Sequence, residues 1–75
     1  MKTTLDGMRM GQTGTVSKVN GEGVLRCRLL DMGLIPKTKV KVIKFAPLGD
    51  PMEISLRGYD LTIRKGDASM IEVEV

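Results

Sequence analysis

Apolar and polar residues alternate along much of the chain, and this pattern predicts β-strands. The firmest alternation runs over residues 39–45 (KVKVIKF), where Val40, Val42 and Lys44 share one parity. Residues 13–19 (TGTVSKV) show a weaker form of the same pattern. We therefore expect a strand in each of these two segments.

Three further segments extend the predicted sheet toward the C-terminus. Residues 52–56 and 61–63 alternate apolar with polar side chains, and Gly58 lies between them. This arrangement predicts a hairpin that turns near residues 57–60. Residues 71–75 place apolar residues against glutamates with a period of two, which predicts a last strand that buries one face.

One segment breaks the period of two and predicts a helix. Within residues 22–33 (EGVLRCRLLDMG), Leu25, Leu29 and Met32 recur at i, i+4 and i+7. Gly33 can adopt the left-handed backbone conformation that closes a helix, and a proline follows soon afterwards. We expect one short helix of about three turns in this segment.

Short strands, glycine-marked turns and a single helix are typical of a small barrel. A chain of 75 residues fits one domain, so we expect residues 1–75 to form a single, mainly β domain. We predict a small SH3-like barrel of about five strands with one short helix near residues 22–33, because closure protects strand edges from aggregation. An open antiparallel sheet with the helix on one face fits the same pattern.

Composition indicates the cellular compartment in which the chain is expected to work. A lone cysteine, Cys27, cannot form an internal disulfide, which fits a reducing compartment. Residues 1–10 mix charged with apolar residues, unlike a signal peptide, and no apolar run reaches the length of a membrane span. We expect a cytoplasmic protein without direct membrane insertion. A net charge of +3 favours attraction to acidic surfaces.

Residue types that serve catalysis and metal binding are scarce. There are no histidines, and one cysteine cannot build a Cys/His cluster, so we expect no catalytic base, no transition-metal site and no cofactor. Cys27 has no histidine to activate it and is expected in or near the core. Phe45 and Tyr59 are the only aromatic residues that could stack on bases, so no nucleic acid partner is expected. These features favour a binding protein and not an enzyme.

Several short motifs, taken in order, resemble a known family. The pieces are Arg28-Leu29, Met32-Gly33-Leu34 with Pro36, the run APLGDP at residues 46–51, Leu56-Arg57-Gly58, and Ala68 with Ile71 and Val73. Together they closely resemble the FeoA family, small cytoplasmic SH3-like proteins associated with bacterial ferrous iron transport. The family often has leucine at the position of Met32 and glycine at the position of Lys37.

The resemblance implies an accessory or regulatory protein that binds the FeoB permease, a membrane protein with a GTP-hydrolysing cytoplasmic region. A similar barrel occurs in iron-dependent transcriptional repressors, so an SH3-like domain related to theirs is one alternative. Family-level descriptions also attach transition-metal-ion binding to this domain. The other alternative is therefore a carrier that holds Fe(II) through carboxylates such as Asp50, Glu53 and Asp60.

Candidate partner-binding residues fall on the predicted helix, in the loop of residues 46–51 and beside the hairpin turn. They are Arg26, Arg28, Pro47, Gly49, Asp50, Pro51 and Arg57. The proline-bracketed loop is either a rigid contact surface or a mere connector. Arg28 borders the buried stripe of the helix. It can pair with a carboxylate at the end of the barrel or contact a partner protein, and we favour the pairing within the chain. For Arg57 we expect contact with an acidic partner surface.

Overall fold

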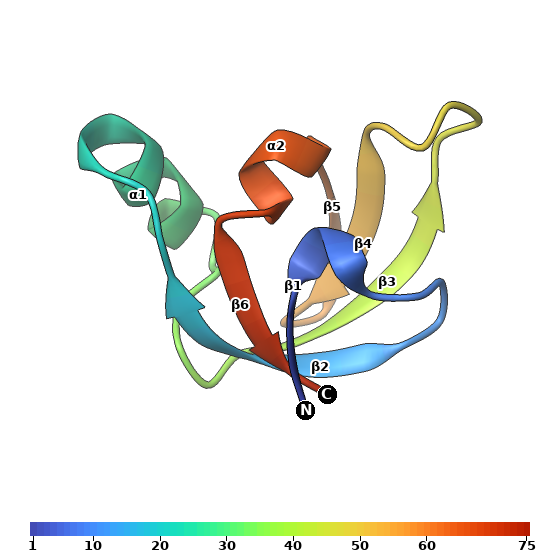
Figure 1. Ribbon diagram of the computed structural model, residues 1–75, viewed down its shortest axis with the longest axis horizontal. Coiled ribbons are helices and arrows are strands. Elements are labelled where there is room, and N and C mark those ends of the chain that lie inside the picture. Colours follow the sequence, from blue (N-terminus) through green and yellow to red (C-terminus); the bar gives the residue numbers. More distant parts are fainter.

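A six-stranded antiparallel sheet that curls around a hydrophobic core forms the body of the protein (Figure 1). The structure, a computed structural model, describes all residues from 1 to 75. In chain order the elements are β1 (Lys2–Thr4), the 3-10 helix η1 (Leu5–Gly7), β2 (Thr13–Val19), α1 (Gly23–Asp31), β3 (Lys39–Phe45), β4 (Met52–Leu56), β5 (Tyr59–Ile63), α2 (Lys65–Ala68) and β6 (Ile71–Glu74). The strand order is β1-β6-β2-β3-β4-β5, so β1 and β5 are the edges.

Strands β2 and β3 have the bounds that the alternation predicts. Val40 and Val42 of β3 are buried, as expected. Lys44 has the same parity in the sequence but is exposed. The pairing register of β3 with β4 shifts between Val42 and Lys44, and such an irregularity reverses the facing of the residues that follow.

Strands β4 and β5 form the predicted hairpin. Leu56 pairs with Tyr59, and Arg57 and Gly58 make the two-residue turn between them. Both turn residues have positive φ, 51° at Arg57 and 84° at Gly58, the conformation of a type I′ turn. The turn therefore lies within residues 57–60, and that prediction is confirmed.

Helix α1 lies where the periodicity places it, although it is shorter than the predicted range of residues 22–33. Its C-terminus is a Schellman motif, in which the Gly33 N–H donates to the Leu30 carbonyl at 3.0 Å and the Leu34 N–H donates to the Leu29 carbonyl at 3.2 Å. Gly33 has φ 97°, as expected of a helix-closing glycine. Leu29 and Leu34 are both buried, so this ending also anchors the helix to the core.

The sequence patterns do not predict three short elements of the structure, which are β1, η1 and α2. Strand β1 pairs with β6, which raises the number of strands from about five to six. Helix α2 packs against η1, and each contributes one fully buried side chain, Ala68 and Leu5. Elements of three or four residues are too short to show a hydrophobic period, which explains why local patterns miss them.

Fifteen buried residues form one hydrophobic cluster, to which every strand except β1 contributes. The cluster comprises Leu5, Met8, Val16, Val19, Leu29, Leu34, Val40, Val42, Met52, Ile54, Leu56, Ile63, Ala68, Ile71 and Val73. The candidate site residues lie outside this cluster, on α1, in the loop between β3 and β4 and in the turn between β4 and β5. No helix of the structure has the length and apolar character needed to cross a membrane.

Candidate functional site

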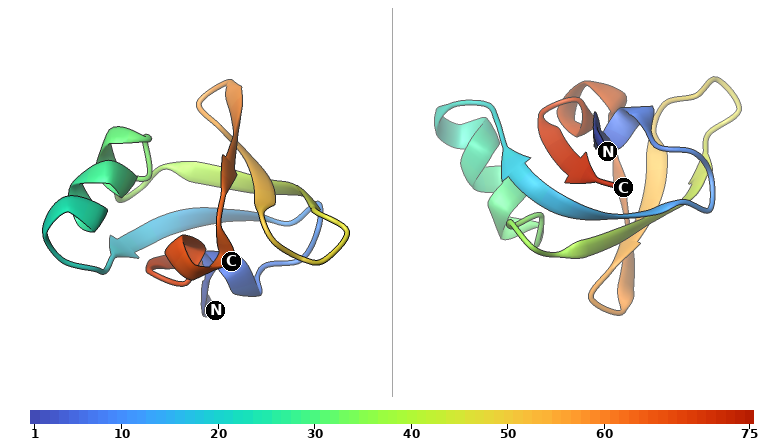
Figure 2. Two further views of the ribbon diagram at one scale, coloured as in Figure 1. Left: turned by 90° about the horizontal axis from the view of Figure 1, so that it is seen from above. Right: turned by 60° about the horizontal axis from the view of Figure 1, so that its bottom comes forward.

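The structure places the predicted contact residues at three separate corners of the molecule. Arg26 and Arg28 lie on α1, and Arg57 lies in the turn between β4 and β5. The loop of residues 46–51, between β3 and β4, carries the others, which are Pro47, Gly49, Asp50 and Pro51. Figure 2 shows these three segments projecting in different directions. No single contact surface therefore contains all of the predicted residues.

A groove of about 480 Å³ lies between α1 and the end of β5, and we call it the α1–β5 groove. Its lining residues are Arg28, Met32, Thr62, Ile63, Arg64 and Asp67. Ile63 is buried, whereas the side chains of Arg28 and Arg64 are exposed. The groove thus combines two guanidinium groups and one carboxylate with a smaller apolar part, and arginine is enriched in protein–protein interfaces.

A tyrosine and a glycine hold α1 in place beside this groove. The Tyr59 hydroxyl, from the start of β5, donates a hydrogen bond to the Met32 carbonyl oxygen at the end of α1. A Cβ at Gly33 would stand 3.0 Å from the Tyr59 oxygen and 3.3 Å from a Leu56 methyl group. Only glycine permits both this close approach and the positive φ of Gly33, so the two residues set the position of the helix end.

A second hollow, of about 180 Å³, adjoins the groove. It is lined by Lys44, Ala46, Pro51, Met52, Glu53 and Thr62. Thr62 lines both hollows and belongs to the edge strand β5. Arg28 and Pro51, which are far apart in the sequence, therefore lie on one surface that extends across β5.

Internal hydrogen bonds fix the loop of residues 46–51. The Gly49 N–H donates to the Ala46 carbonyl at 2.7 Å, and the Ala46 N–H donates to the Pro51 carbonyl at 2.9 Å. The Asp50 carboxylate accepts a hydrogen bond of 3.0 Å from the Lys65 N–H at the start of α2. The loop is thus tied both to itself and to α2, and Asp50 has a structural partner within the chain.

Two exposed apolar residues on this side were missed by the sequence reasoning. Leu48, at the tip of the loop of residues 46–51, is 96% exposed, and Val24, near the start of α1, is 76% exposed. The sequence gives a weak indication that each is exposed. Leu48 stands in a turn between Pro47 and Gly49, and Val24 lies off the apolar stripe of the helix. Val24 lies one helical turn before Arg28 of the groove, and Leu48 belongs to the same loop as Pro51 of the second hollow.

Two predictions for α1 are wrong. Cys27 is exposed and not part of the core, because the helix buries one stripe along Leu25 and Leu29, and Cys27 lies about 200° around the helix from either residue. Arg28 makes no ion pair with the sheet. The two ion pairs of the protein join the N-terminal amine to Glu74 at 3.0 Å and Lys44 to Glu53 at 4.0 Å. Arg28 is therefore available at the rim of the α1–β5 groove.

The carboxylates of the carrier hypothesis are not gathered. Asp50 is engaged with α2, Glu53 faces Lys44, and Asp60 lies in β5 opposite Ser55. No three of the aspartates, glutamates and the single cysteine of the chain form a cluster able to hold a metal ion. A preformed ligand set at these positions is thus missing.

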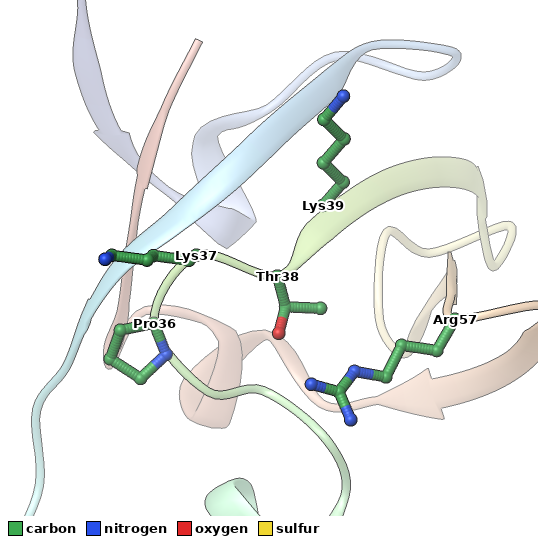
Figure 3. Close-up of a pocket in the computed structure, with 5 residues that line it drawn as sticks. All are labelled: Pro36, Lys37, Thr38, Lys39 and Arg57. Atoms are coloured by element: carbon green, nitrogen blue, oxygen red, sulfur yellow. The ribbon is translucent and has the colours of Figure 1, made fainter.

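Arg57 lines a hollow of its own, away from the α1–β5 groove. Its neighbours there are the residues that precede β3, from Pro36 to Lys39 (Figure 3). The structure therefore separates Arg57 from the other predicted contact residues and places it in a strongly cationic setting.

Two solved structures of low sequence identity establish the fold. The Stenotrophomonas maltophilia FeoA complexed with zinc, named as a procaryotic SH3 domain protein, is 18% identical, with a TM-score of 0.85 over 96% of this chain and 89% of that chain. A manganese-dependent transcriptional repressor is 16% identical, with a TM-score of 0.87 over 97% of this chain and 41% of that chain. The predicted SH3-like fold is confirmed.

More similar proteins establish the family. The FeoA-like protein from Clostridium acetobutylicum is 34% identical, with a TM-score of 0.92 over 99% of this chain and 86% of that chain. The Fe(2+) transport protein A/Fe(2+) transporter FeoB fusion protein of Porphyromonas gingivalis (strain ATCC BAA-308 / W83) is 35% identical over 71 residues, which cover 95% of this chain but only 8% of the fusion protein. The sequence profile of the FeoA domain matches residues 3–75. The chain belongs to the FeoA domain family.

Proposed function

We propose that this chain is a non-enzymatic accessory protein of ferrous iron uptake, acting in the cytoplasm as one domain of residues 1–75. Its partner is a FeoB-type permease, bound at the GTP-hydrolysing cytoplasmic region. The observation that carries the proposal is the similarity to a Porphyromonas gingivalis protein in which Fe(2+) transport protein A and the transporter FeoB share one chain. Fusion holds two parts at a high effective concentration, which suits a pair that works in contact.

The surface that supports this role best extends from α1 across β5 to the loop of residues 46–51. It has the anatomy of a contact surface, with exposed apolar side chains at Val24 and Leu48 and polar groups of both signs between them. The loop is already fixed by its own hydrogen bonds, so a partner that contacts it has little flexibility to suppress. Arg26 lies about 200° around α1 from Arg28 and so points away from the α1–β5 groove, whereas Arg28 adds positive charge at one end of the surface. Arg57 lies outside it.

Calorimetric titration of the purified chain with the cytoplasmic region of the FeoB-type permease from the same organism tests the proposal. We expect saturable binding, and we expect Leu48→Ser to weaken it by about tenfold, the effect typical of an apolar side chain buried at an interface. Met10→Ser is the matched control, because Met10 is also apolar and 62% exposed but lies outside this surface. Equal losses in the two variants would remove Leu48 from the interface, and absence of binding by the wild-type chain would contradict the proposal.

Anaerobic equilibrium dialysis with Fe(II) separates this role from that of an iron carrier. Because Asp50, Glu53 and Asp60 are not gathered into a cluster, we expect no stoichiometric binding of Fe(II) at micromolar concentrations. Stoichiometric binding that Asp50→Asn or Glu53→Gln abolishes would favour the carrier instead.

A further inference from the structure

The segment that precedes β3 and the turn between β4 and β5 form a pocket of about 340 Å³, which we call the cation pocket. Its lining residues are Pro36, Lys37, Thr38, Lys39 and Arg57 (Figure 3). Three of these residues are positively charged and none is acidic. Neither ion pair of the protein involves them. The pocket therefore concentrates positive charge that nothing in the chain neutralises.

Backbone strain is concentrated in the same pocket. Lys37 and Arg57 are the two non-glycine residues with positive φ, 76° and 51°. The Lys37 N–H donates to the Val16 carbonyl at 2.7 Å, and the Val16 N–H donates to the Thr38 carbonyl at 2.8 Å, so β2 holds the segment in this conformation. Side chains disfavour this region of φ, and residues held in it cluster at functional sites.

Thr38 supplies an independent sign of a missing ligand. The residue is only 7% exposed, and its hydroxyl is the one buried side-chain polar atom of the protein that has no hydrogen-bond partner. In Figure 3 the hydroxyl and the Arg57 guanidinium extend into the same space beneath the segment. A buried hydroxyl without a partner is costly, and a bound acceptor would remove that cost.

We propose that the cation pocket binds a phosphoryl group, either as inorganic phosphate or as the terminal phosphates of a nucleotide. The Arg57 guanidinium binds two phosphate oxygens, and the Thr38 hydroxyl, which is shielded from solvent in the free protein, donates to a third once the exposed Arg57 side chain moves onto the anion. Lys37 and Lys39 point away from this space in Figure 3, but both are exposed, and their flexible stems let the ammonium groups turn toward a bound anion. This proposal is independent of the permease partner.

The chemistry of the lining favours phosphate over other anions. The pocket contains three cationic side chains and one hydroxyl. A phosphoryl group carries more negative charge and more acceptor oxygens than a carboxylate, which has one charge and two oxygens, so it can bind more of these groups at once. No aromatic or large apolar side chain lines the pocket, so nothing there recognises a nucleobase. We therefore expect the pocket to recognise the phosphate and not the rest of the molecule that carries it.

Titration of the isotope-labelled chain, followed by its backbone amide signals, tests the proposal. The probes are inorganic phosphate, ATP and glutamate, each compared with chloride at equal ionic strength. We expect phosphate or ATP to shift the signals of residues 36–39 and 57–58 saturably, and a preference between the two identifies the source of the phosphoryl group. Shifts that do not saturate, or glutamate binding as tight as phosphate binding, would overturn the proposal.

Two variants connect the binding to the named groups. We expect Arg57→Gln and Thr38→Val each to weaken phosphate binding by about tenfold, the effect of losing one hydrogen bond to a charged group. Arg9→Gln is the control, because it removes the same charge from an exposed residue outside the pocket. Thr38→Val should also raise the melting temperature, since it removes an unpaired buried hydroxyl, so weaker binding cannot be attributed to unfolding. Affinities equal to that of the control in both variants would overturn the assignment.

Discussion

Replacing Gly33 with alanine is expected to loosen the end of α1 that borders the α1–β5 groove. Gly33 has φ 97°, and a Cβ would stand 3.0 Å from the Tyr59 oxygen. A side chain in the left-handed region costs about 1–2 kcal/mol. Displacing the Tyr59 hydroxyl from the Met32 carbonyl oxygen loses about 0.5–1.5 kcal/mol more. We therefore expect Gly33→Ala to lower the free energy of unfolding by roughly 1.5–3.5 kcal/mol.

Gly11→Ala provides the matched control for this prediction. Gly11 has φ 83°, and a Cβ there would meet no atom within 4 Å, so the variant carries the backbone cost alone. Urea denaturation followed by circular dichroism gives both free energies of unfolding. We expect Gly33→Ala to lose about 1 kcal/mol more than Gly11→Ala. Equal losses would refute the claim that the contact between Gly33 and Tyr59 holds the helix end.

Three further substitutions test individual contacts. Cys27→Ser should change the free energy of unfolding by less than about 0.5 kcal/mol because the thiol is exposed, and protection of Cys27 from a thiol reagent in the native protein would contradict this. Asp50→Ala should cost about 1 kcal/mol in urea denaturation because the Lys65 N–H loses its acceptor. Asp50→Asn, which keeps an acceptor oxygen, should lose less, and equal losses would argue against this hydrogen bond. Arg57→Asn should stabilise the protein by about 0.5 kcal/mol, since asparagine tolerates the positive φ of the turn, and a lower melting temperature would refute the turn type.

Sequence patterns predict the elements whose buried and exposed residues alternate within one short segment. A strand with one buried face shows alternating apolar and polar residues, and this pattern predicts the observed bounds of β2 and β3. Gly33 likewise marks the end of α1 because few other residues tolerate its backbone conformation. The outward facing of Lys44 depends on a register shift between two strands, and β1 is defined by pairing with β6 at the other end of the chain. Neither feature has a local signature.

The candidate site was harder to predict because tertiary packing assembles it. The loop of residues 46–51 could be recognised from its prolines and glycine, but its connection to α2 through Asp50 depends on the folded chain. Cys27 illustrates the reverse error, since a residue type that is usually buried lies on the outer face of a helix that buries only one stripe. The unpartnered hydroxyl of Thr38 and its closeness to Arg57 appear only in three dimensions.

Mapping the interface by nuclear magnetic resonance tests the central claim most directly. The isotope-labelled chain would be titrated with the unlabelled cytoplasmic region of the FeoB-type permease from the same organism, and the perturbed amide signals placed on the structure. We predict that they cluster on α1, at the end of β5 and in the loop of residues 46–51, the surface that carries Val24 and Leu48. Perturbations confined to β1 and the outer face of β2 and β3, or no perturbation at all, would contradict the account.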